Sequence, residues 1–226
     1  MDVVDGSLVL SPGDLVDFLA CGHLTRLERR VAASELFRPA EDDPEAEVLR
    51  RRGDEHERSE LGRLVAEGRS VVSIEPTGAA SGQLAAAAAA TVRAMRAGVE
   101  VIHQATFFDG RWRGHADFLV RVGAPSRLGP WSYEVIDTEL ARRPTPQALL
   151  QLCAYSEQVA RIQGTWPEVM VVVTGDGERH RHRVADARSY YRLAKQRLER
   201  ALEATAPAPY PERVARCQRC AWARRC

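Results

Sequence analysis

Residues 99–138, VEVIHQATFFDGRWRGHADFLVRVGAPSRLGPWSYEVIDT, contain the pattern that decides the fold of this chain. Two stretches, 99–108 and 111–122, flank Asp109-Gly110, a dipeptide that strongly favours a tight β-hairpin turn. Residues 131–138 alternate between apolar and polar side chains, which predicts a third strand. The middle of the chain is therefore predicted to supply three consecutive strands.

Helices are predicted on both sides of these strands. Ser11 followed three residues later by Asp14 is typical of a capped helix start, and apolar spacing continues the helix to about Ser34. Further helices are expected over 41–67, 83–97, 146–163 and 186–204, and further strands over 71–74, 169–173 and 179–184. This order predicts a single mixed α/β domain spanning residues 1–226.

Composition narrows the class of function. The chain has 32 basic and 31 acidic residues, so any surface that binds nucleic acid must be local. Lys195 is the single lysine, which excludes most lysine-dependent mechanisms unless that residue serves them. No apolar run approaches the length of a membrane span and no signal-peptide pattern precedes Asp14, so we expect a cytoplasmic protein with no membrane partner.

Three of the five cysteines crowd into the last ten residues. Cys217, Cys220 and Cys226 form a C-x2-C-x5-C tail, and Cys21 is the candidate for a fourth ligand. Cys153 lies in an apolar helix, where a buried free thiol is the ordinary interpretation. Four thiolates suit either structural zinc or a [4Fe–4S] cluster, and the spacing alone does not decide between them. Either centre would join the two ends of the chain.

Polar side chains on the predicted strands suggest a second site. Asp117 lies on the second hairpin strand and Asp137 near the end of the third, so neighbouring strands would bring the two carboxylates together. Such a pair can hold one or two Mg²⁺ ions. His56 is a candidate ligand from an earlier helix, and Gln151 and Tyr155 share one face of the 146–163 helix. Each signal is weak when taken alone.

Together these motifs resemble the RecB-like PD-(D/E)XK nucleases. That family has G-x-x-D on one strand, D-x-K on the next, Q-x3-Y on a helix and a histidine on an earlier helix. The matching residues here are Gly114 to Asp117, Asp137 to Glu139, Gln151 to Tyr155, and His56. The cysteine arrangement is similar to the iron–sulfur, AddB-like members, in which one cysteine precedes the nuclease core and three follow it. The resemblance covers about residue 8 to Cys226.

The resemblance implies a restriction-endonuclease-like α/β core with a mixed sheet between helices. Residues 8–40 would form an N-terminal cluster helix, 43–204 the nuclease core and 205–226 the iron–sulfur tail. The implied ligands of Mg²⁺ or Mn²⁺ are His56, Asp117, Asp137 and the backbone carbonyl of Thr138. Gln151 and Tyr155 would place the DNA strand. The resemblance also favours [4Fe–4S] over zinc at Cys21, Cys217, Cys220 and Cys226.

Glu139 departs from the family pattern, which has lysine at this position. The lysine is expected to orient the attacking water and to offset negative charge in the transition state, and glutamate reverses its sign. Three interpretations follow: a natural non-cleaving relative, a deliberately inactivated variant, or substitution of the lysine by Arg142 or Arg143. The second is slightly favoured because the rest of the motif is intact.

The leading hypothesis is a metal-dependent DNA nuclease module that hydrolyses phosphodiesters, with single-stranded DNA as the expected substrate. Similarity around residues 11–21 and 133–140 to a bacterial branch of the family suggests a superfamily 1 helicase as partner in the same natural chain. The alternatives are a catalytically silent DNA-binding or scaffold domain and a zinc-stapled interaction module. The residue at position 139 separates the first two, and the visible spectrum tests the third.

Overall fold

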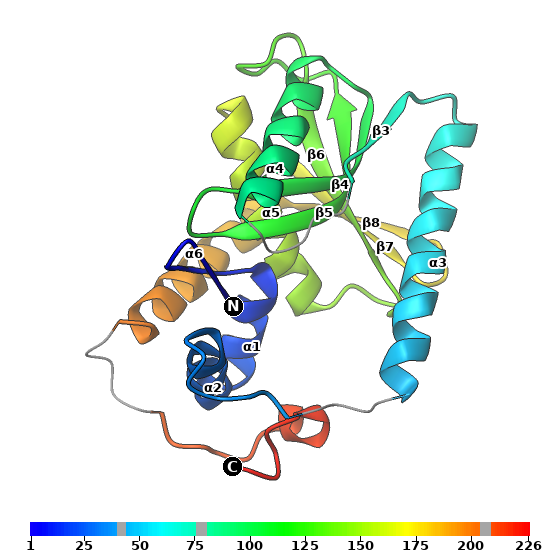
Figure 1. The fold of residues 1–226 in the computed structure, drawn as a ribbon. Helices are drawn as coiled ribbons and strands as arrows, with labels where there is room; N and C mark the ends of the chain where they lie inside the picture. The colour runs from blue at the N-terminus through cyan, green and yellow to red at the C-terminus, as the bar shows by residue number, and fades with distance from the viewer. Residues whose placement is uncertain (40–43, 76–80, 204–208) are drawn as a thin grey trace.

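A six-stranded mixed sheet forms the centre of the protein in the computed structural model, which describes residues 1–39, 44–75, 81–203 and 209–226 (Figure 1). Its strands lie in the order β3-β4-β5-β6-β7-β8. The pairs β3–β4 and β6–β7 are parallel, and the other neighbours are antiparallel. The strand bounds are β3 Val71–Ser73, β4 Val101–Phe108, β5 Arg113–Val122, β6 Ser132–Glu139, β7 Val169–Thr174 and β8 Arg179–Arg183.

Helices cover both faces of this sheet. The larger core lies between the sheet and α4 (Ser81–Arg96), α5 (Pro146–Gln163) and α6 (Val184–Ala201). On the opposite face, Leu64 of α3 (Pro44–Ala66) packs against alternate residues of four neighbouring strands. These are Val101, Phe118, Val120, Ile136, Val171 and Val173. Burial of both faces explains why β7 is apolar throughout. The predicted mixed α/β class is confirmed.

The predicted hairpin is also confirmed. Asp109 donates its backbone N–H to the Trp112 carbonyl at 3.1 Å, and Gly110 has a φ of 89°, which glycine adopts without strain. The Asp109 carboxylate accepts the N–H groups of Arg111 and Trp112 and closes the turn. The other expected helices and strands occur within a few residues of their predicted bounds. The ends of the predicted helices at 41–43 and at 204 lie outside the described residues.

The N-terminal region differs from the prediction in two ways. A short hairpin, β1 (Asp2–Val4) and β2 (Ser7–Val9), precedes the first helix and was not predicted. The single helix expected to reach Ser34 is broken into α1 (Pro12–Ala20) and α2 (Gly22–Ala32). Cys21 is the breaking point because its backbone is extended, with φ −162° and ψ 107°. The predicted capping box of Ser11 and Asp14 is present.

The C-terminal tail returns to the helices at the N-terminus, as Figure 1 shows. The Trp222 indole is buried and donates to the Glu28 carboxylate of α2 at 2.9 Å. Arg216 donates to the Asp17 carboxylate of α1 at 2.7 Å. These contacts join residues almost two hundred positions apart in sequence. Part of the proline-rich spacer before the tail lies outside the described residues. Among the helices described, none has the length and apolar character needed to cross a membrane.

We expect Gly175→Ala to destabilise the protein. A Cβ at this position would lie 2.5 Å from the backbone carbonyl oxygen of Leu140, and neither backbone segment can move freely. The Gly175 N–H also donates to the Ala141 carbonyl, which fixes the approach of the two loops. The free energy of unfolding should fall by about 1–3 kcal/mol, as for other overpacked positions. Urea denaturation measures it.

Gly53→Ala on α3 is the matched control. A Cβ there meets no atom within 4 Å, and alanine favours the helix by about 0.5–1 kcal/mol. This variant should therefore be as stable as the parent or more stable. Equal losses of stability in the two variants would contradict the described approach between Gly175 and Leu140.

Candidate active site and cysteine centre

Asp117 and Asp137 occupy opposed positions where β5 and β6 stop pairing. The last backbone pair of the two strands joins Phe118 to Ile136, and Asp117 and Asp137 occupy the next opposed positions. Beyond that pair, hydrogen bonds to side chains replace the backbone hydrogen bonds of the sheet. The Asp117 N–H donates to Asp137 Oδ1 at 3.1 Å, and Thr138 donates its N–H and its hydroxyl to Asp117 Oδ2 at 2.7 and 2.6 Å. The two carboxylates are therefore held together, as predicted.

The proximity of these two acids shifts their titration. Burial raises the pKa of Asp117 to about 6, against the hydrogen bonds from Thr138 that favour the charged form. Burial and the charge of Asp117 raise the pKa of Asp137 well above its usual value. Two buried carboxylates cannot both ionise cheaply unless a cation lies between them. A divalent ion with oxygen ligands matches this requirement.

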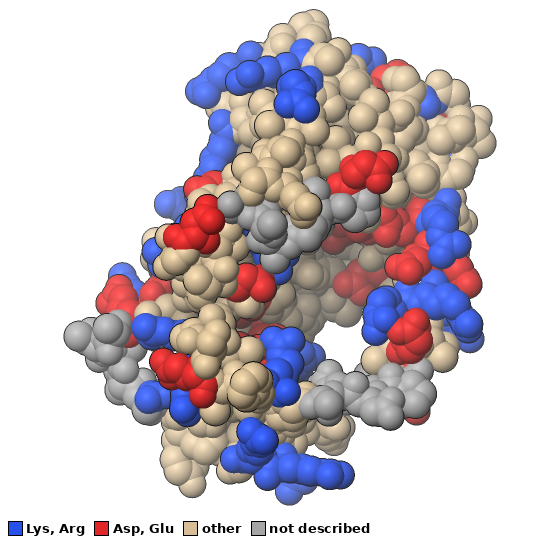
Figure 2. Space-filling model, in the orientation of Figure 1, with Lys and Arg blue, Asp and Glu red and all other residues tan. Residues whose placement is uncertain are grey.

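Glu57 of α3 is a third acidic residue at the site, and it was not predicted. Its Oε1 lies 2.8 Å from His103 Nε2 and also accepts a hydrogen bond from the Gln104 amide. Burial raises the Glu57 pKa, but these two hydrogen bonds, together with the charges of His103 and Arg58, make the net shift downward. Its negative charge contributes to the raised pKa values of Asp117 and Asp137. Figure 2 shows acidic side chains in the hollow between α3 and the body of the protein.

His56 was expected to complete the metal shell with the two aspartates, and its ring contacts β7. Its Nε2 is 3.1 Å from the Val173 carbonyl oxygen on β7, and no contact with Asp117 or Asp137 is described for it. Consecutive helical residues point about 100° apart, so the side chains of His56 and Glu57 leave α3 in different directions. The prediction of His56 therefore identified the turn of α3 that lies nearest the site. The residue of this turn whose charge raises the pKa values of Asp117 and Asp137 is Glu57.

A backbone irregularity accompanies the site. Gln104 on β4 has a φ of 54°, a left-handed conformation that is uncommon for residues other than glycine. It lies opposite Asp117 between the pairs His103–Phe118 and Ala105–Ala116, and is itself unpaired in the ladder. The amide of Gln104 reaches Glu57 from this position. Strained backbone of this kind is often found at functional sites.

The predicted helix pair Gln151 and Tyr155 lies on α5, which packs against β5 and β6. Tyr155 is buried, and burial together with the charges of Asp137 and Asp117 raises its pKa. Its ring lies so close to Gly114 that a Cβ there would be 2.7 Å from a ring carbon. This explains the glycine of the G-x-x-D motif. Gln151 is half-buried, and its side chain makes no hydrogen bond with the described residues.

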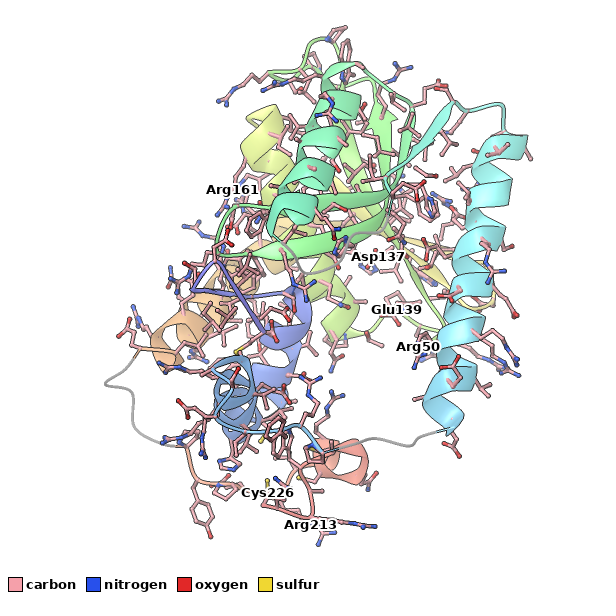
Figure 3. The ribbon with its side chains drawn as sticks, in the orientation of Figure 1. Arg50, Asp137, Glu139, Arg161, Arg213 and Cys226 are labelled. Atoms are coloured by element: carbon pink, nitrogen blue, oxygen red, sulfur yellow. The ribbon has the colours of Figure 1, made fainter. Side chains whose placement is uncertain are left out.

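Glu139 ends β6 on the same side of the strand as Asp137, as its spacing predicts. Burial raises its pKa, and its charge adds to the shift of Asp137. Figure 3 shows both side chains directed toward the space beside α3, where Arg50 is labelled; the Arg50 guanidinium pairs with Glu47 on its own helix. Within the described residues, Glu139 has no ion-pair partner.

The predicted substitute cations do not occupy the site. Arg142 and Arg143 are exposed on the loop after β6, and neither forms an ion pair with a described residue. Lys195 also lies away from the site. Its ammonium group pairs with Glu157 and lies 5.0 Å from the centre of the Trp112 ring, between α5 and α6. The carboxylate site is thus strongly negative.

The four predicted cluster cysteines line one small pocket. Cys21 lies between α1 and α2, and Cys217, Cys220 and Cys226 lie on the tail. Burial and the proximity of the other three cysteines raise the pKa of the Cys226 thiol. Cys21 Sγ accepts the Leu24 N–H and Cys217 Sγ the Val214 N–H, both at 3.4 Å. Figure 3 labels Cys226 at the end of the tail, below α2.

The donor set of this pocket suits a soft metal centre, because four cysteine thiolates are usual ligands of structural zinc and of iron–sulfur clusters. Apolar neighbours, among them Leu24, Leu27 and Trp222, would shield it from water. Cys226 is exposed, so the pocket is open to solvent on that side. Over the described ranges, no group of three or more His, Cys, Asp or Glu side chains is arranged for direct metal binding.

Cys153 differs from the other four cysteines, as predicted. It is fully buried in α5, against Met170, and burial raises the pKa of its thiol to about 12. It therefore acts as a small apolar side chain in the core.

Comparison with known proteins gives little further information. No family model matches the sequence, and no curated protein matches it. A solved structure entitled "Crystal structure of SSO0001" is similar over 97% of this chain and 86% of that chain, with 12% sequence identity and a TM-score of 0.47. A similarity this distant supports no argument about function.

We expect Asp137→Asn to stabilise the metal-free protein at neutral pH. The folded carboxylate pair binds protons more tightly than the unfolded chain, so its contribution to stability is lost as pH rises from about 4 through about 6 and beyond. Asparagine keeps an acceptor for the Asp117 N–H without the charge. The gain in unfolding free energy at pH 7.5 should be at least about 1 kcal/mol and should shrink at pH 5.

Urea denaturation at the two pH values gives this comparison. Asp54→Asn, which removes an exposed carboxylate from α3, is the control and should change neither value appreciably. A gain for Asp137→Asn that is equal at pH 5 and pH 7.5 would show that the aspartate pair does not retain a proton.

We expect Cys21→Ser to abolish the metal content of the cysteine pocket and to loosen the tail. Loss of one thiolate removes a ligand from the α1–α2 junction, whereas Cys153→Ser removes a thiol that faces only the core. Metal analysis and the visible spectrum of anaerobically purified protein distinguish the two variants. Iron gives absorbance near 400 nm and zinc gives none. Equal metal loss in both variants, or none in either, would refute this assignment.

Proposed function

We propose that this chain is a metal-dependent DNA nuclease module of the RecB-like PD-(D/E)XK type, weakened or silenced by Glu139. One observation carries the proposal. Asp117 and Asp137 face each other at the point where two neighbouring strands separate, with raised pKa values that a divalent cation would reverse. Gly114 of the G-x-x-D motif also contacts Tyr155 of the Q-x3-Y motif.

Asp117, Asp137 and the Thr138 carbonyl are the residues that would hold Mg²⁺ or Mn²⁺. Such an ion supplies a nucleophilic water and neutralises charge on a phosphate. Glu57 adds a carboxylate from α3 and fixes His103 and Gln104 around the site. His56, one helical position away, stays a candidate ligand only if its ring leaves the Val173 carbonyl. Tyr155 borders the site from α5, and Tyr155 and Gln151 would place the DNA strand.

The cysteine pocket supports a structural role for a [4Fe–4S] cluster at Cys21, Cys217, Cys220 and Cys226. These four residues come from both ends of the chain, and the ion pair of Arg216 with Asp17 lies beside them. A bound centre would therefore fasten the tail to α1 and α2. It would stabilise the fold without entering the reaction at the carboxylates. A superfamily 1 helicase in the same natural chain remains part of this proposal.

Glu139 favours a second candidate function, a DNA-binding domain that does not cleave. Its side chain adds negative charge beside Asp137 at the position where a cation is required, and the described residues provide no compensating cation. A unit charge about 4 Å away is worth about 4 kcal/mol at an effective dielectric constant near 20. Replacing a favourable charge by an unfavourable one therefore costs several powers of ten in rate.

We expect Glu139→Lys to raise Mn²⁺-dependent cleavage of labelled single-stranded DNA by at least about a hundredfold. The half-buried position faces the space beside α3, so a longer side chain can extend without entering the core. The lysine returns positive charge to the place where negative charge develops. Glu139→Gln removes the repulsion alone and should give a smaller increase.

The control for this gain is Glu139→Lys combined with Asp117→Ala, which should be inactive. If Glu139→Lys cleaves no better than the parent chain while it still binds Mn²⁺, the nuclease proposal fails. The non-cleaving DNA-binding function then becomes the better account of the site.

A further inference from the structure

The C-terminal tail carries one large buried side chain among exposed residues. Trp222 is 2% exposed, although the four residues that follow it, 223–226, are all exposed. Its ring lines the cysteine pocket together with Leu24 and Leu27 of α2. A buried tryptophan removes more apolar area from water than most other side chains. Trp222 therefore attaches the tail to α2 through apolar contact.

The indole N–H of Trp222 also has a specific partner. It donates to Glu28 Oε1 at 2.9 Å, and the second oxygen of this carboxylate accepts a hydrogen bond from Arg38. The Glu28 side chain is only 12% exposed, so its charge needs these donors. Cys21, Leu24 and Glu28 follow one another at intervals of three and four residues and so lie along one face of α2. The partner of the indole thus lies on the face of α2 that begins with the first cysteine.

The same tryptophan fixes the backbone that carries two of the tail cysteines. The Trp222 carbonyl accepts the N–H groups of Arg225 and Cys226 at 2.8 and 3.1 Å. Cys220 lies two residues before Trp222, and its carbonyl accepts the Ala223 N–H at 3.0 Å. Cys220 and Cys226 therefore belong to one short turn around Trp222. The position of this turn follows the position of the indole.

Cys226 depends most on this support, because it is exposed at the open side of the pocket. Cys217 has another attachment nearby, since its neighbour Arg216 pairs with Asp17 of α1 at 2.7 Å. For Cys220 and Cys226 the described attachment to the helices is Trp222. A metal centre whose ligand is displaced at the open side becomes accessible to water and to chelators. Retention of the metal therefore depends on how firmly Trp222 is held.

We propose that Trp222 and Glu28 are positioning residues for the metal centre at the four cysteines. Their hydrogen bond holds the turn that carries Cys220 and Cys226 against α2, and the indole ring keeps water from the side of the centre that faces the helix. The pair thereby sets how tightly the centre retains its metal, although neither residue is a ligand. Groups that orient metal ligands commonly change metal affinity by about 10–100-fold. The proposal rests on the cysteine centre of the proposed function and is independent of the carboxylate site.

Trp222→Phe tests the hydrogen bond, because it removes the indole N–H and keeps an apolar ring in the pocket. Protein purified anaerobically is mixed with excess EDTA, and the iron or zinc that stays on the protein is measured over time. The variant should release its metal about tenfold faster than the parent. Glu28→Ala removes the other partner of the bond and should give a similar rate. Since both changes break the same bond, the double variant should release metal no faster than the single variants.

Two controls separate positioning from a general loss of stability. Trp131→Phe also removes an indole hydrogen bond, one donated to the Met95 carbonyl of α4 at 3.1 Å, and should retain metal as the parent does. Urea denaturation of the metal-free proteins gives the second control. The described contacts of Trp222 are with the tail and α2, so metal-free Trp222→Phe should unfold at nearly the same urea concentration as the metal-free parent.

The outcomes distinguish this inference from the proposed function. If the parent retains metal and both single variants release it at the parental rate, the inference is refuted and the cysteine centre stands. Equal acceleration in Trp131→Phe, a clear fall in the urea midpoint of metal-free Trp222→Phe, or multiplied effects in the double variant would also refute it. If the parent carries no metal after anaerobic purification, the cysteine centre and this inference fail together. The nuclease proposal is then still decided by the aspartate and Glu139 variants.

Discussion

Two carboxylates face each other where β5 and β6 separate, and most features of the site follow from that arrangement. Like charges at opposed positions on neighbouring strands repel, so a protein gains no stability from Asp117 and Asp137 as a bare pair. The structure holds them in place with three hydrogen bonds from backbone and hydroxyl groups. It adds Glu57 and Glu139 to the same region, which increases the cost further. A divalent cation bound between the two carboxylates would turn this unfavourable arrangement into a favourable one.

A second constraint acts at the ends of the chain. The tail makes its described contacts with α1 and α2 through a few groups, chiefly Trp222 to Glu28 and Arg216 to Asp17. The break at Cys21 places its side chain in a pocket with the three cysteines of this tail. Fastening the ends places α2 at a fixed position relative to the sheet.

The sequence predicted the parts of the fold that depend on local pattern. Asp109-Gly110 set the hairpin, and the apolar run after Val169 predicted a strand buried on both faces. The spacing of Asp137 and Glu139 placed both on one side of β6. Other features depend on tertiary contacts and gave no clear signal. The left-handed Gln104 and the partnership of Glu57 with His103 arise only when α3 meets β4. The choice between His56 and Glu57 depends on the rotation of α3, which periodicity does not fix to within one residue.

The carboxylate pair is tested most directly by counting protons released when Mn²⁺ binds. Calorimetric titrations at pH 6 in two buffers of different ionisation enthalpy give this number without requiring catalysis. The raised pKa values of Asp117, at about 6, and of Asp137 predict proton release that is substantial at pH 6 and falls as the pH increases. Mn²⁺ binding without proton release at pH 6, or release that persists in an Asp117→Asn, Asp137→Asn variant, would contradict a shared cation at these two aspartates.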